Sequence, residues 1–104
     1  MNYISQINYF YLLIIQHPIP SNAQALWHRL MAYCSSFGWK DEFSVSNGRL
    51  AEDLGISKQS VSALRKVLEA SKLITYKENG KNKIGIYHIN AILNPYFDIK
   101  TVDE

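Results

Sequence analysis

Basic side chains are concentrated in one part of this 104-residue sequence, spaced as a phosphate-binding surface would require. Residues 58–83 include seven basic and two acidic residues, so the net charge of this segment is +5, compared with +2 for the whole chain. The basic residues are Lys58, Arg65, Lys66, Lys72, Lys77, Lys81 and Lys83. Ammonium and guanidinium groups bind phosphate oxygens, and such contacts dominate the affinity of proteins for nucleic acids. This segment therefore favours nucleic-acid binding over a purely solvated surface.

The predicted contact residues fall into two groups by side-chain chemistry. Those expected to approach base edges are Lys58, Gln59, Ser62 and Lys66. Those expected to hold phosphates are Arg65, Lys81 and Lys83, with Lys77 beside them. Gln59 can pair with adenine through two hydrogen bonds. Glu52 and Asp53 would repel phosphates if they faced DNA.

No catalytic or metal-binding constellation is found in the sequence. The acidic pairs Asp41–Glu42 and Glu52–Asp53 are adjacent residues, whose side chains diverge on a helix or strand. One cysteine and three scattered histidines cannot fill a four-ligand zinc site, and Cys34 is expected in the core. No histidine has a triad partner at a known spacing, and no glycine loop could cradle phosphates. The sequence predicts a binding module that is not an enzyme and has no cofactor.

The segment 47–71 has the pattern of a helix-turn-helix. Gly55 suits the left-handed conformation at the turn, and the small Ala51 lets a second helix cross close to the first. Ser57 is expected to cap that second helix, over residues 58–71. The apolar positions expected to face inward are Ile56, Val61, Leu64 and Leu68. A plain α-hairpin is the alternative.

A β-hairpin is predicted directly after these helices. Two β-rich runs, Leu73–Glu78 and Ile84–Ile89, are joined by a turn that contains Asn79–Gly80. A helix-turn-helix followed by a hairpin is a winged helix. The short run Glu42–Val45 is expected to be a further strand. The predicted fold is mainly α with a small β-hairpin, a winged helix-turn-helix with an extra N-terminal helix.

Two helices are predicted ahead of this motif. The first, over residues 3–16, is apolar nearly all round, so either a second copy of the chain or the C-terminal tail is expected to cover it. The residues predicted to mediate self-association are Ile4, Ile7, Phe10, Tyr11 and Ile14. The second helix should run over residues 22–36, with Ser21 and Gln24 as a capping box and Gly38 at its end.

Length and composition indicate one domain in a reducing compartment. We expect a winged-helix domain over residues 1–90 and a tail or linker over 91–104. A lone cysteine forms no internal disulfide, which favours the cytoplasm. No Lys or Arg precedes Arg29, so a signal peptide is not expected, and the apolar run from Tyr9 to Ile15 is too short to span a membrane.

Four stretches of the sequence resemble one family. They are MNYISQINYFY at 1–11, ALWHRLM at 25–31, GW at 38–39 leading into EFSV at 42–45, and LAEDLGIS at 50–57. Together they resemble the N-terminal winged-helix region of DnaD-like primosome proteins and phage replisome organisers, over residues 1 to about 90. The resemblance implies a role in starting DNA replication, with self-association and recruitment of a helicase loader or other replisome proteins.

Other interpretations stay open beside this resemblance. In such proteins a separate C-terminal domain contributes DNA binding, whereas this sequence ends at Glu104. We therefore expect either a piece of a longer protein or a stand-alone winged helix. An oligomerisation scaffold without DNA contact and a winged-helix transcription regulator are the alternative functions.

Overall fold

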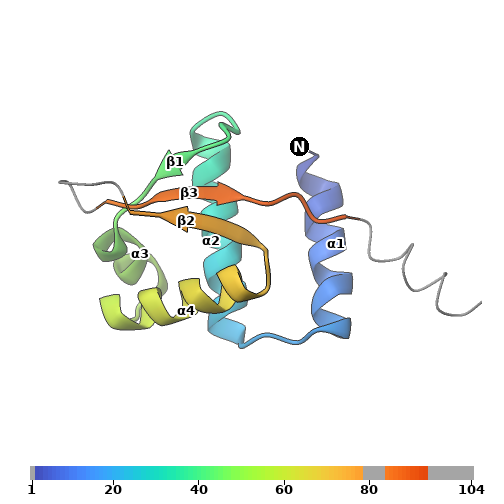
Figure 1. Ribbon diagram of the computed structural model, residues 1–104, viewed down its shortest axis with the longest axis horizontal. Coiled ribbons are helices and arrows are strands. Elements are labelled where there is room, and N and C mark those ends of the chain that lie inside the picture. Colours follow the sequence, from blue (N-terminus) through green and yellow to red (C-terminus); the bar gives the residue numbers. More distant parts are fainter. Residues whose placement is uncertain (1, 79–83, 94–104) are drawn as a thin grey trace, which may run out of the picture. The chain divides into compact units, whose positions relative to one another are not determined.

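Four helices and three strands make up the part of the chain that the structure, a computed structural model, describes, namely residues 2–78 and 84–93 (Figure 1). The elements follow in the order α1 (Tyr3–Gln16), α2 (Ser21–Ser36), β1 (Phe43–Ser44), α3 (Asn47–Leu54), α4 (Lys58–Ala70), β2 (Ile74–Lys77) and β3 (Ile86–Ile89). Residues 20–90 form one structural unit, and α1 with the segment after residue 90 forms another. No helix in the described ranges has the length and hydropathy needed to cross a membrane.

Helices α2, α3 and α4 pack together through apolar side chains that recur every three or four residues. The fully buried ones are Ala23, Leu26, Trp27, Leu30 and Met31 in α2, Leu50 in α3, and Val61 and Leu68 in α4. Because α4 contacts both other helices, its inner face belongs to the core. Its opposite face is left for solvent.

The turn between α3 and α4 has the predicted geometry. Gly55 adopts the left-handed conformation, with φ 67° and ψ 35°, and the Ile56 N–H donates to the Ala51 carbonyl at 3.1 Å. Ser57 then caps α4, because its hydroxyl accepts a hydrogen bond from the Ser60 N–H at 3.1 Å. Ser46 caps α3 in the same way, through the Arg49 N–H at 3.1 Å. The helix-turn-helix is therefore confirmed.

The start of α2 differs from the prediction. The helix begins at Ser21 itself, and its N-cap is Pro20, which makes no side-chain cap hydrogen bond. The proposed capping box of Ser21 and Gln24 was wrong, because the Gln24 N–H donates to the Pro20 carbonyl at 3.1 Å, which makes Ser21 the first residue of the helix rather than its cap. The end agrees with the prediction: Gly38 is left-handed at φ 77°, just after the C-cap Phe37.

The strands form an antiparallel sheet in the order β1-β3-β2 (Figure 1). In the central strand, Tyr87 pairs with Phe43 on one side and with Tyr76 on the other. The Tyr87 ring centroid lies 5.8 Å from that of Phe43 and 4.9 Å from that of Tyr76. The predicted fold class, a mainly helical chain with a small sheet in a winged-helix arrangement, is confirmed. The predicted Asn79–Gly80 turn lies outside the described residues.

Helix α1 begins with a side-chain cap and carries one buried amide. Asn2 caps the helix by accepting a hydrogen bond from the Ser5 N–H at 3.1 Å. The Gln6 amide makes two hydrogen bonds to the backbone of Ile92, donating at 3.1 Å and accepting at 2.7 Å. The start of the C-terminal segment thus lies beside α1, as expected if the tail folds back on it.

Candidate nucleic-acid interface

The outer face of α4 carries three of the predicted contact residues. Lys58, Gln59 and Lys66 are exposed, whereas Val61 and Leu68 on the opposite face are fully buried. Thirteen helical residues extend about 20 Å at roughly 1.5 Å per residue, and a helix of ordinary diameter fits the major groove of B-DNA. This face can therefore present two cations and one amide to a groove.

Arg65, which was predicted to hold phosphates, lies on the inner side of α4 and not on this face, and its contact with DNA stays a prediction. The residue is only 8% exposed, because it stands four residues after Val61 and three before Leu68, on the inner stripe. Its guanidinium donates to the Asn47 amide oxygen at 2.7 Å and to the Tyr87 hydroxyl at 3.1 Å. The guanidinium carbon lies 3.9 Å from the Tyr76 ring centroid, a cation–π contact.

Ser62 lies at the edge between these two faces and is half-buried. Its hydroxyl oxygen is 3.3 Å from the amide nitrogen of Asn47 and 3.4 Å from a guanidinium nitrogen of Arg65. Asn47 was not among the predicted contact residues. Its contact with Ser62 depends on how α3 packs against α4, so spacing along the chain gave no signal for it.

Lys58 lies against the first turn of α3. A Cβ atom built on Gly48 would come 3.3 Å from Lys58 Cε, so the absence of a side chain at Gly48 leaves room for the lysine. The N-terminal end of a helix carries a partial positive charge. Lys58 and this helix end therefore reinforce one positive region, favourable to an anion.

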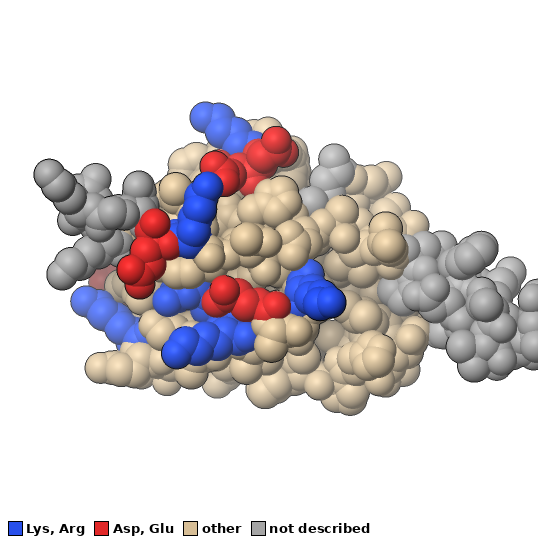
Figure 2. All heavy atoms as spheres, in the orientation of Figure 1, with Lys and Arg blue, Asp and Glu red and all other residues tan. Residues whose placement is uncertain are grey.

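The structure describes only one of the three lysines that were predicted to contact DNA from the wing, Lys77. Lys77 is exposed at the end of β2, but it pairs with Glu42 at 3.0 Å, so its charge is already offset by a carboxylate. Lys81 and Lys83 lie outside the described residues. Figure 2 shows basic side chains with acidic ones among them over the α4 side of the visible face, so this surface is mixed rather than uniformly basic.

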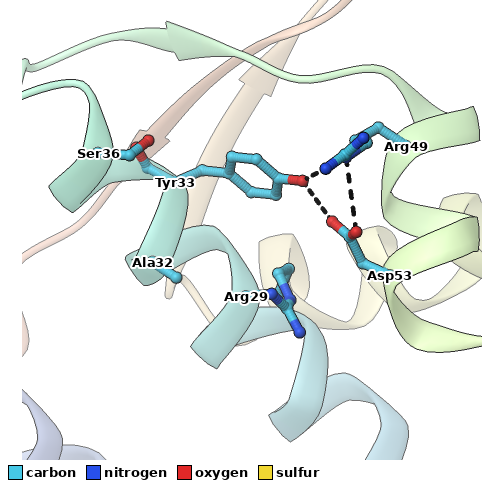
Figure 3. Close-up of a pocket in the computed structure, with 6 residues that line it drawn as sticks. All are labelled: Arg29, Ala32, Tyr33, Ser36, Arg49 and Asp53. Carbon is cyan, nitrogen blue, oxygen red and sulfur yellow. Dashed lines mark hydrogen bonds and ion pairs between the residues drawn. The ribbon is translucent and has the colours of Figure 1, made fainter.

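The acidic residues of α3 were a predicted obstacle to DNA binding. The Asp53 carboxylate accepts a hydrogen bond from the Tyr33 hydroxyl and pairs with Arg49 at 3.5 Å, and its side chain is only 15% exposed (Figure 3). The Arg49 guanidinium also donates a hydrogen bond to the Tyr33 hydroxyl at 3.0 Å, and this bond and the charge of Asp53 raise the pKa of Arg49. Asp53 is therefore held against α2, whereas Glu52 stays exposed.

An open depression of about 220 Å³ lies beside Tyr33, Arg49 and Asp53, between α2 and α3 (Figure 3). Arg29, Ala32 and Ser36 of α2 line it together with Tyr33, Arg49 and Asp53. The lining thus contains two guanidinium groups, those of Arg29 and Arg49, and one carboxylate, that of Asp53, which pairs with Arg49. The α2 residues that line it face away from the core side chains of that helix, so the depression is not part of the outer face of α4.

The predicted self-association residues of α1 are not all on its surface. Ile4 and Tyr11 are exposed, and Ile7 and Ile14 are half-buried. Phe10 is fully buried, contrary to the exposure expected of a self-association residue. The all-apolar pattern of the helix could not distinguish Phe10 from its neighbours.

Comparisons with known proteins identify the fold and no family. A scan against protein-family models and a search of curated proteins find no match to this chain. One solved structure, described as "N-Terminal domain of DNA binding protein", is similar with a TM-score of 0.62 and 20% sequence identity. The likeness covers 85% of this chain and 76% of that one. At this identity it shows a shared fold.

Proposed function

We propose that residues 20–90 bind duplex DNA, with the outer face of α4 in the major groove. The observation that carries the proposal is the exposure of Lys58, Gln59 and Lys66 on one face of a capped helix that follows a left-handed glycine turn. Helix-turn-helix proteins read DNA with this second helix. The role is binding rather than catalysis.

The structural neighbour supports this proposal, because that protein is a DNA-binding one of the same fold. The resemblance to DnaD-like proteins supports a narrower role, in which the bound module helps to start replication and recruits a helicase loader. This narrower role predicts that the DNA complex of the protein retains a purified helicase loader from the same organism. If adding the loader leaves the electrophoretic mobility of the protein–DNA complex unchanged, a role as a transcription regulator is favoured instead.

The DNA proposal is tested by fluorescence anisotropy with a 20-base-pair duplex at several salt concentrations. Lysine contacts to phosphates release counterions, and each contributes about 0.9 to the slope of log affinity against log salt. Lys58→Ala with Lys66→Ala should therefore weaken binding and make the slope shallower by about 1.8.

A matched pair of cations provides the control. Arg29 and Lys40 are exposed but lie outside α4, so Arg29→Ala with Lys40→Ala removes the same charge without touching the proposed surface. It should leave most of the affinity and slope intact. Equal losses in the two double variants, or no binding of duplex by the unaltered protein at low salt, would contradict the proposal.

Self-association through α1 is a second candidate function, and it is compatible with the first. Ile4 and Ile15 are 72% and 76% exposed, and with the exposed Tyr11 they form one stripe along the helix. Exposed apolar stripes of this kind favour burial against another molecule.

Light scattering after size exclusion tests the second candidate. If the protein self-associates through this stripe, Ile4→Asp with Ile15→Asp should convert the oligomer to a monomer, because a buried carboxylate would disfavour the contact. The unaltered protein is measured at about 100 µM, a concentration at which even a weak association is populated. If it is a monomer there, this function is rejected.

A further inference from the structure

Arg65 fixes the orientation of the Asn47 side chain. A guanidinium group has five N–H donors and no acceptor, so the atom of Asn47 that lies 2.7 Å from it must be the amide oxygen. The amide nitrogen of Asn47 then faces Ser62, 3.3 Å from its hydroxyl oxygen. Reversing the amide would place two donors against each other, which the buried Arg65 does not allow.

The same geometry determines what the Ser62 hydroxyl can do. A hydroxyl group has one hydrogen and two acceptor lone pairs. Both groups that approach Ser62 Oγ, the amide nitrogen of Asn47 and the guanidinium of Arg65, are donors. The Ser62 hydrogen therefore has no acceptor in this cluster and remains available to donate elsewhere.

The position of Ser62 on α4 shows where that donor can be used. Lys58 precedes it by four residues and Lys66 follows it by four, so the three side chains lie on one stripe of the helix. Both lysines are exposed and Ser62 is half-buried between them. Two cations thus flank a hydroxyl that can only donate.

The charge of Arg65 strengthens this polarity. In the described ranges no carboxylate lies within ion-pair distance of its guanidinium, whose partners are an amide, two hydroxyls and an aromatic ring. A hydrogen bond from a charged donor is stronger than one between neutral groups and polarises its acceptor. Because Arg65 polarises it, the Ser62 hydroxyl is a stronger hydrogen-bond donor than an unpolarised hydroxyl.

We propose that Ser62 donates a hydrogen bond to an acceptor atom of DNA, and that Arg65 and Asn47 are positioning residues that keep its hydrogen turned outward. This inference rests on the proposed DNA binding by α4. The acceptor is an oxygen or nitrogen lone pair, supplied either by a backbone phosphate or by a base edge in the major groove.

The experiment is a double-mutant cycle measured by anisotropy, on one 20-base-pair duplex of A·T pairs and one of G·C pairs. Ser62→Ala should weaken binding about threefold to tenfold, the usual range for one hydrogen bond. Asn47→Ala should weaken binding while Ser62 is present and have little effect on the Ser62→Ala background, because Asn47 acts through that hydroxyl.

Ser60→Ala is the matched control, since Ser60 is on the same helix but its hydroxyl contacts Ser57, the cap of that helix. It should keep the affinity within about twofold, and melting by circular dichroism shows that each variant is folded. Equal losses on the two duplexes assign the acceptor to a phosphate, and unequal losses assign it to a base edge.

Two results would overturn the inference while leaving DNA binding intact. One is a Ser62→Ala variant that binds as tightly as the unaltered protein. The other is an Asn47→Ala variant that loses the same affinity in both backgrounds. If the unaltered protein binds neither duplex, the proposed function itself fails, and this inference fails with it.

Discussion

Helices α1 and α4 each bury one long polar side chain, yet they leave opposite chemistry exposed. In α1 the buried side chain is Gln6 and the exposed ones include Ile4 and Ile15. In α4 it is Arg65, and the exposed ones include Lys58 and Lys66. Under the two functions proposed above, α1 would bind an apolar surface and α4 a polyanion.

The comparison also shows what a buried polar side chain does in each unit. Gln6 makes its two hydrogen bonds to the backbone of one residue, Ile92. Arg65 bonds to side chains from α3, α4 and β3 and covers a ring in β2. Gln6 therefore fixes one neighbouring segment, whereas Arg65 connects α3, α4, β2 and β3. The predicted cost of removal differs accordingly.

The largest effect is expected for Arg65→Ala. The substitution leaves the buried Tyr87 hydroxyl and the Asn47 amide without their charged partner and removes the packing over Tyr76. The free energy of unfolding should fall by about 2 to 4 kcal/mol. Urea unfolding followed by circular dichroism measures it.

The exposed neighbour Lys66 provides the control for that measurement. Lys66→Ala should change the free energy of unfolding by less than about 0.5 kcal/mol, as surface substitutions usually do. If Arg65→Ala were equally mild, Arg65 would not connect these elements, and the contrast between the two helices would be lost.

A smaller loss is expected for Gly85→Ala, which tests how tightly the ring beneath Arg65 is held. A Cβ atom built on Gly85 would overlap the Tyr76 ring, and that ring contacts both Arg65 and Tyr87. Overpacking of this kind costs about 1 to 3 kcal/mol in the free energy of unfolding.

A double variant separates this overlap from other effects of Gly85→Ala. On a Tyr76→Ala background the added methyl group has no ring to displace, so the same substitution should cost much less. An undiminished loss on that background would mean that Gly85 is required for a reason other than the ring.

Much of the fold could be predicted because its signals are local. The Gly55 turn and the Ser57 cap depend on the conformational preferences of residues next to one another, and both are confirmed. The start of α2 was missed where two local signals competed. The first backbone hydrogen bond of the helix goes to the Pro20 carbonyl, so Ser21 lies inside the helix and does not cap it.

The candidate site was harder to predict because charge and position disagree at Arg65. Its residue type indicates a surface contact, whereas its spacing from Val61 and Leu68 indicates the core, and the core position prevailed. The meeting of Asn47 with Ser62 depends on how α3 packs against α4, which spacing along the chain does not specify.

Gln6→Ala should have a modest effect, confined to the unit that contains α1. The loss of two partly buried hydrogen bonds should lower stability by about 1 kcal/mol and speed hydrogen exchange at the Ile92 amide. Gln6→Glu is the matched variant, because its carboxylate still accepts from the Ile92 N–H but no longer donates to the carbonyl. Equal exchange rates at Ile92 in both variants would show that this acceptor does not hold the segment.

The smallest effect is expected for the pH dependence that His28 confers. Burial lowers the pKa of His28, so the folded protein binds a proton at this ring less readily than the unfolded chain does. The stabilisation is present above the unfolded pKa of about 6.5 and is lost as the pH falls through the lower folded value.

To isolate this contribution, the free energy of unfolding is measured for the unaltered protein and for His28→Gln between about pH 8 and pH 5. This range brackets the reference pKa of about 6.5. The unaltered protein should lose stability more steeply below that pKa than the variant, because glutamine takes up no proton. The half-buried ring lies edge-on to the Trp27 indole, with centroids 5.1 Å apart, so the substitution lowers stability at every pH as well. Only the difference in slope reports the proton, and parallel profiles would mean that protonation of His28 leaves folding unaffected.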